Sequence, residues 1–218
     1  MSATFEREAK ERSEEMKSTL AIAILSICLV PAVQAQIKKG IIAEAEPGLG
    51  ERGTSRVLYW NQDKDVAAGA ITVDFGRPAW RKEYEEAGRF DLMTKGKVWR
   101  LGNNYWTILD SNLPIKIAGR DIPVGLWYLG LDRSADGKTW SLAFIDPVKA
   151  RRGRHDGFTM ETVPIEFKVP MTTGQTSGLT EKLTMTLTAA KEDIRKVTLR
   201  ISWGRVELMA PIQVGLEN

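Results

Sequence analysis

The sequence predicts an all-β fold, an antiparallel β-sandwich or barrel-like sandwich of about eight to ten strands with one short helical segment near residues 79–93. Two observations carry this prediction. From Thr54 onward, apolar residues alternate with polar or small ones at a period of two, which is typical of half-buried strands. Turn-forming residues such as Asp136-Gly137 separate these short runs and predict hairpins.

The predicted strands follow from this alternation in chain order. The clearest is 183–188, in which apolar residues face one way and threonines the other. Gly119-Arg120-Asp121 is predicted as a turn, and Gly204 as a bulge or bend. The runs that show the pattern lie near residues 57–59, 71–75, 115–117, 126–131, 140–145, 183–188, 197–203 and 206–208.

One segment favours a helix instead. Across residues 79–93, Trp80, Tyr84 and Ala87 fall near helical spacing. Gly88 and a mixture of charges interrupt the pattern, so we expect this helix to be short or irregular.

Residues 16–35 have the order of features of a secretory signal peptide. Lys17 provides a positive charge, an apolar run follows over residues 20–30, and small residues end at Ala35. The run is shorter than the roughly 20 residues that a membrane-spanning helix needs. The sequence therefore predicts cleavage and export, to the periplasm or outside the cell, with no stable membrane span afterwards. The acidic residues 1–15 fit poorly before such a signal, so either translation starts at Met16 or they form a solvated charged tail.

The remaining chain is predicted to comprise a flexible lead-in at residues 36–53 and a single β-sandwich domain at residues 54–214. Its composition excludes several functions. The chain has 31 Lys and Arg against 28 Asp and Glu, with no basic stripe of interleaved aromatics, so nucleic-acid binding is not expected. The only cysteine, Cys28, lies in the predicted signal, and the only histidine, His155, lies in an arginine-rich loop. Because a nucleophile elbow is also absent, we predict no catalytic residue, no metal site and no cofactor.

One chemically dense segment, residues 96–106, is the candidate site. It contains two cations, two tryptophans, a tyrosine, two amides and two glycines. Aromatic rings, amides and cations together are suited to binding sugars and other polar ligands. A structural interpretation is also open, in which Trp99 packs in the core, Arg100 pairs with a carboxylate such as Asp74, and Asn103-Asn104 form a turn. The candidate ligand-binding residues are Arg77, Lys97, Trp99, Arg100, Asn104 and Tyr105.

Four segments carry a resemblance to a known family. Residues 71–78 (ITVDFGRP), 96–102 (GKVWRLG), 115–128 and 199–208 are similar to signature segments of the bacterial domain-of-unknown-function 2911 family. The resemblance spans about residues 54–212 and implies an exported, mostly β domain without an assigned activity, so it transfers no catalytic residue. The chain departs from the family after Gly102, where Tyr105 stands at a usually acidic position.

Three functions from different classes remain. The leading hypothesis is a non-enzymatic module that binds a saccharide or another cell-envelope ligand at residues 97–106. The first alternative is a hydrolase that uses two facing carboxylates, drawn from Asp74, Asp110, Glu161 and Glu166. The second is a structural or assembly module without a small ligand, which would show an exposed apolar patch or an unpaired edge strand. The fold class does not choose among them, since sandwiches serve all three functions.

Overall fold

The computed structural model describes residues 50–216 except residues 87 and 177. The predicted extension (1–15), the predicted signal peptide (16–35) and residues 36–49 of the predicted lead-in lie outside this range. Within it, strands dominate and every pairing between them is antiparallel. The all-β prediction is therefore confirmed. The described residues form 12 strands, more than the sequence pattern had indicated.

The strands are connected mostly by short turns, and the first begins at Arg52 rather than at Thr54. In chain order they are β1 (Arg52–Asn61), β2 (Val66–Gly76), β3 (Lys97–Arg100), β4 (Thr107–Ser111), β5 (Ile115–Ile117), β6 (Arg120–Ile122), β7 (Gly125–Arg133), β8 (Trp140–Ile145), β9 (Phe167–Thr173), β10 (Thr180–Ala189), β11 (Lys196–Gly204) and β12 (Val206–Val214).

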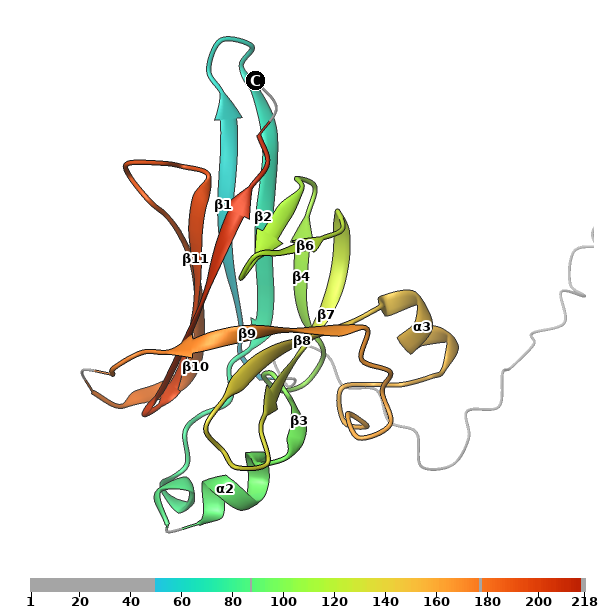
Figure 1. Cartoon of the computed structure of the whole chain (residues 1–218), viewed down its shortest axis with the longest axis vertical. Helices are drawn as coiled ribbons and strands as arrows, with labels where there is room; N and C mark the ends of the chain where they lie inside the picture. The colour runs from blue at the N-terminus through green and yellow to red at the C-terminus, as the bar shows by residue number, and fades with distance from the viewer. Residues whose placement is uncertain (1–49, 87, 177, 217–218) are drawn as a thin grey trace, which may run out of the picture. The chain divides into compact units, whose positions relative to one another are not determined.

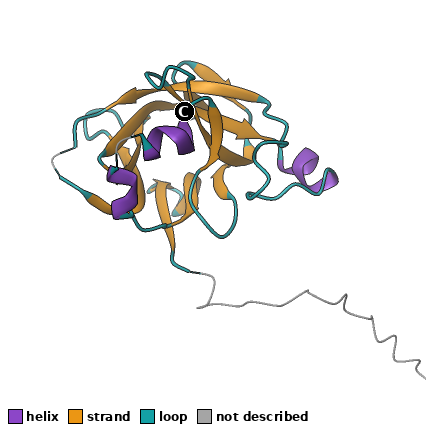
Figure 2. Ribbon diagram, turned by 90° about the horizontal axis from the view of Figure 1, so that it is seen from below, coloured by secondary structure: helices purple, strands orange, loops and turns teal. Residues whose placement is uncertain are grey.

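The sheet curls until its first and last strands meet. Its main path runs β1-β2-β4-β7-β8-β9-β12-β11-β10. The backbone N–H of Leu187 on β10 donates to the Ser55 hydroxyl on β1 at 2.9 Å, which links the two ends of the path. The result is a nearly closed barrel, seen from the side in Figure 1 and from below in Figure 2. Strand β3 pairs with β7 beyond the end of β4, and the β5–β6 hairpin attaches to β12.

The barrel is filled by the residues that the alternation pattern assigned to one face of each strand. Ile71, Val73 and Phe75 of β2 are buried, as are the apolar residues of β10, whereas the threonines of β10 lie on the other face. A second, smaller core lies outside the barrel. There the ring of Trp106 stacks on that of Tyr128, with centroids 4.7 Å apart. A barrel closed in this way leaves few unpaired strand edges and buries a core without any disulfide.

The helical segment predicted at residues 79–93 is present as two short helices. They are the 3-10 helix η1 (Lys82–Glu85) and α2 (Arg89–Thr94). Gly88 separates them with a φ of 79°, a left-handed conformation that glycine adopts at little cost. Both lie at one end of the barrel, the lower end in Figure 1. Trp80, which precedes η1, and Phe90 of α2 pack against Trp203 inside that end, with ring centroids 4.9 and 6.5 Å from that of Trp203.

The helix α3 (Pro147–Arg152) was not predicted, although the sequence contains its start signal. The Asp146 carboxylate accepts from the backbone N–H of Val148 at 2.7 Å, and Pro147 occupies the first turn, where its missing N–H costs nothing. Ala150 of α3 packs into the second core. None of the helices in residues 50–216 is long and apolar enough to cross a bilayer.

Asp146→Ala is expected to lower the free energy of unfolding by about 1 kcal/mol, because the substitution removes the N-cap of α3. Urea unfolding measures the change. Glu192→Ala, at an exposed position on the β10–β11 turn, is the control and should leave stability unchanged. Equal stability of the two variants would show that the cap does not hold α3 on the second core.

Candidate functional site

Strand β3 places alternate side chains on opposite sides of the barrel wall. It pairs through Val98↔Asp132 and Arg100↔Gly130 with β7. Trp99 points inward, where its ring stacks on that of Trp203 at a centroid distance of 5.0 Å. Val98 instead packs against the second core. Because side chains alternate along a strand, Arg100 shares the side of Val98.

A hollow of about 610 Å³ lies beside β3, and we call it the β3 groove. One wall is formed by residues 96–100, and the other by the loop that follows α3. The latter contributes Gly157, Phe158, Met160, Glu161, Val163 and Ile165. A hollow of this volume is in the range of small-molecule binding sites, which combine apolar walls with a few polar groups.

Arg100 is the distinctive side chain of the groove. Its guanidinium carbon lies 4.0 Å from the centroid of the Phe158 ring, a cation–π contact. Its Nη1 is buried without a hydrogen-bond partner, and Arg100 forms no ion pair with any described residue. Burial lowers the pKa of Arg100, and the negative charge of nearby Asp156 acts in the opposite direction. The groove therefore contains a positive charge that forms no ion pair with a carboxylate of the described residues.

The remaining charges of the groove are few. The Lys97 ammonium donates to the backbone oxygen of Leu92 at 3.2 Å, which leaves its charge available to a ligand. Glu161 is the carboxylate among the described lining residues. The two cations against one anion make the lining positive. The sequence had assigned Lys97, Trp99 and Arg100 to one site, and all three line this groove.

The loop between β3 and β4 holds the other candidates of this segment. Asn104 has a φ of 68°, consistent with the predicted turn, and its side-chain nitrogen is buried without a hydrogen-bond partner. Tyr105 is 52% exposed. A hydrogen bond with Tyr128 and partial burial raise its pKa, against the opposing effect of Arg151 and Arg52. Neither residue lines the β3 groove, so both lie beside the site rather than in it.

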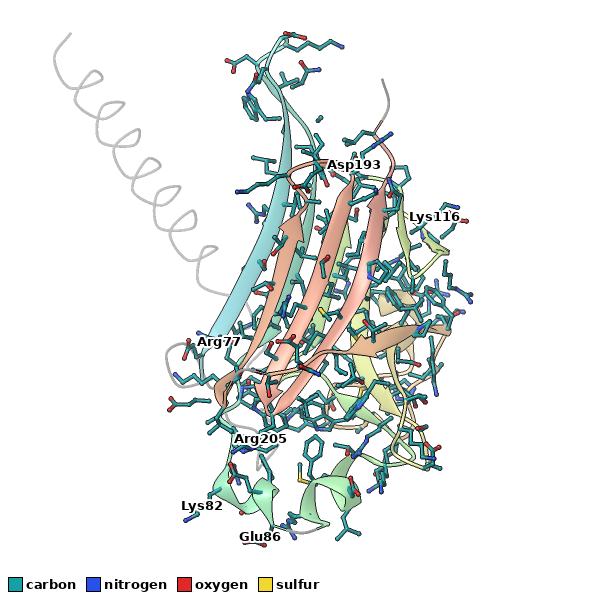
Figure 3. All side chains as sticks on the ribbon, turned by 60° about the vertical axis from the view of Figure 1, so that its left-hand side comes forward. Arg77, Lys82, Glu86, Lys116, Asp193 and Arg205 are labelled. Atoms are coloured by element: carbon teal, nitrogen blue, oxygen red, sulfur yellow. The ribbon has the colours of Figure 1, made fainter. Side chains whose placement is uncertain are left out.

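Arg77 and Asp74 differ from what the sequence indicated. Arg77 lies at the end of β2, as labelled in Figure 3, and its guanidinium pairs with Glu51 and donates to the backbone oxygen of Leu183 at 3.3 Å. It does not line the groove. The expected Arg100–Asp74 pair is wrong, because Asp74 accepts from Nε of Arg52 at 2.9 Å.

Apart from Glu161, which the sequence had offered only as a candidate carboxylate, the groove residues on the loop after α3 were missed by the sequence analysis. Phe158 is presented by a tight turn in which the Asp156 carboxylate accepts from the Phe158 backbone N–H at 2.7 Å. Its ring is 72% exposed although it is large and apolar. The Asp156-Gly157 dipeptide was a readable turn signal, but only the fold shows that this turn meets β3.

Comparison with known proteins gives one match. A family model described as "Protein of unknown function (DUF2911)" matches residues 60–212. No curated protein and no solved structure matches the chain.

Proposed function

The chain belongs to the DUF2911 family of proteins of unknown function, and we propose that it is an exported, non-enzymatic module whose β3 groove binds an acidic saccharide or another anionic component of the cell envelope. Export is supported by the signal-peptide pattern of residues 16–35. Ligand binding is supported by the groove itself.

The observation that carries the proposal is the unpaired Arg100. Burying a cation without a direct ion-pair partner costs free energy. Arg100 is half-buried and forms no ion pair with a described residue, although the charge of Asp156 acts on it from nearby, so its environment is unfavourable in the free protein. An anionic ligand would supply the missing charge. A guanidinium presents a planar fork of donors that matches carboxylate and phosphate groups. Lys97 also lines the groove, although its side chain leaves β3 on the side of Trp99 and donates to the Leu92 backbone oxygen.

The apolar part of the lining indicates the rest of the ligand. Phe158 is covered on one side by Arg100 and remains largely exposed. Val98, Met160 and Ile165 extend the apolar surface beside it. Sugar rings have apolar faces that stack on such surfaces while their acidic groups reach nearby cations. This combination favours a sugar acid over a neutral sugar.

Nothing in the described residues favours the hydrolase alternative. Asp74 is paired with Arg52, and Glu166 with Lys149, whose ammonium lies 2.7 Å from it. Glycoside hydrolysis requires two carboxylates on either side of one bond. Among the described lining residues of the β3 groove, Glu161 is the only carboxylate.

Calorimetric titration with tetragalacturonate tests the proposal, with neutral maltotetraose as the comparison ligand. We expect the protein to bind the acidic oligomer more tightly. Arg100→Gln should weaken that binding about tenfold, because the substitution removes charge-assisted hydrogen bonds to the ligand.

Arg120→Gln is the matched control. The Arg120 guanidinium also stacks on a phenylalanine, 4.2 Å from the centroid of the Phe167 ring, but it does not line the groove. The control should bind like the wild type. Equal affinity for the two oligomers, or equal effects of the two substitutions, would overturn the proposal. An assembly module without a small ligand would bind neither oligomer.

A further inference from the structure

A second hollow lies at the other end of the barrel from α2. We call it the mouth pocket, and its volume is about 710 Å³. It is bounded by the β1–β2 hairpin, by the β10–β11 turn and by the segment after β12. Figure 1 shows the hairpin projecting beyond the other strands at this end, and Figure 3 labels Asp193 on the neighbouring turn. The mouths of β-barrels are frequent sites for small ligands.

The rim of the mouth pocket exposes large apolar side chains. Leu58, Trp60, Val66 and Ile194 all line it, and each is more than half exposed. Scattered apolar residues are ordinary on protein surfaces, whereas a group around one hollow indicates a binding site. The Tyr59 hydroxyl donates to the backbone oxygen of Ile194 at 2.9 Å and joins the hairpin to the turn. The walls are therefore connected before any ligand arrives.

The polar groups of the mouth pocket present donors to a ligand. The Asn61 side-chain oxygen already accepts from the Lys64 backbone N–H at 3.0 Å. The Asn112 side-chain oxygen accepts from the Ala70 backbone N–H at 2.7 Å. Both amides thus keep their NH₂ groups for a ligand. Lys64 is the charged residue among the described lining residues, which include no carboxylate.

We propose that the mouth pocket binds a single-chain anionic amphiphile, with its apolar chain against Trp60, Val66 and Ile194 and its carboxylate at Lys64. The free amide N–H groups favour an acceptor head group, and the positive charge of Lys64 favours an anionic one. The exposed apolar rim requires a hydrocarbon body. The mouth pocket shares no lining residue with the β3 groove, so this inference does not depend on the function proposed for the groove.

Decanoate and decanol test the proposal, since they share a chain and differ in charge. Calorimetry of the purified protein should show tighter binding of decanoate. Lys64→Gln should weaken decanoate about fivefold and leave decanol unchanged, because a partly exposed ion pair contributes at most about 1 kcal/mol. Val66→Ser should weaken the binding of both ligands, because it removes apolar surface from the rim. Decanoate should also change tryptophan fluorescence, and Trp60→Phe should remove most of that change while calorimetry still detects binding.

Two matched controls test the location. Lys138→Gln removes an exposed lysine, and Val124→Ser a similarly exposed valine, both outside the mouth pocket. Each should bind as the wild type does. The proposal is overturned if neither ligand binds, if decanol binds as tightly as decanoate, or if the control variants lose as much affinity as the pocket variants. Dimerisation that Val66→Ser abolishes, without decanoate binding, would assign the rim to a second copy of the chain instead.

Discussion

Trp203→Ala is expected to lower the free energy of unfolding by about 3–5 kcal/mol, as in other truncations of large buried aromatics. Trp203 is 4% exposed and lies at the centre of the aromatic cluster at the α2 end of the barrel. Its ring contacts those of Trp80, Tyr84 and Trp99 at centroid distances of 4.9, 5.3 and 5.0 Å. Its indole N–H donates to the backbone oxygen of Pro78 at 3.0 Å, and that oxygen would lose one of its two donors, keeping the Leu183 backbone N–H. Urea unfolding measures the loss.

Two comparison variants separate packing from the hydrogen bond. Trp203→Phe keeps an aromatic ring against Trp99 and removes the donor, so it should cost less than the alanine variant. Trp127→Ala removes a half-buried tryptophan whose indole also donates to a backbone oxygen, that of Pro123 at 3.0 Å. It should cost less than Trp203→Ala, because less apolar surface is lost. A loss below about 1 kcal/mol for Trp203→Ala would show that the cluster does not stabilise the barrel.

Gly76→Ala is expected to destabilise the protein by about 3 kcal/mol and to weaken binding in the β3 groove. Gly76 ends β2, where a Cβ atom would overlap the backbone oxygen of Asn103 and lie 2.8 Å from its nitrogen. Backbone cannot move aside as a flexible side chain can. The loop between β3 and β4 would have to shift, and Arg100 is attached to it.

Gly178→Ala is the control for this prediction. A methyl group at Gly178 would meet no described atom within 4 Å, and the residue has no left-handed φ, so the substitution should leave stability and binding unchanged. Urea unfolding and the tetragalacturonate titration give the two readouts. Wild-type stability of Gly76→Ala would mean that the loop does not pack against β2.

The fold was readable where one strand face is buried and the other is solvated. β10 and β11 show the clearest alternation, and both are present in the structure. β3 was missed because it is only four residues long and none of its side chains is fully buried. β9 was missed although Val169 and Met171 alternate with polar residues or proline, since its Pro170 argues against a strand.

The candidate site was only partly readable, because a short segment does not show which way its side chains point. Lys97, Trp99 and Arg100 were predicted together and do meet at one groove. The alternation of β3 nevertheless directs Trp99 into the barrel core, as the structural interpretation had it. Phe158 could not be assigned to the site, because its contact with Arg100 joins segments far apart in the chain.

The sequence by itself determined the fold class and the segment richest in functional groups, since both depend on local patterns of period and composition. Only the tertiary structure decided which cations remain unpaired and where the barrel opens. Arg77 and Arg100 are the same residue type, yet Arg77 pairs with Glu51, whereas Arg100 stacks on Phe158 and forms no ion pair with a described residue. That difference arises from contacts between distant segments, which the local sequence pattern does not predict.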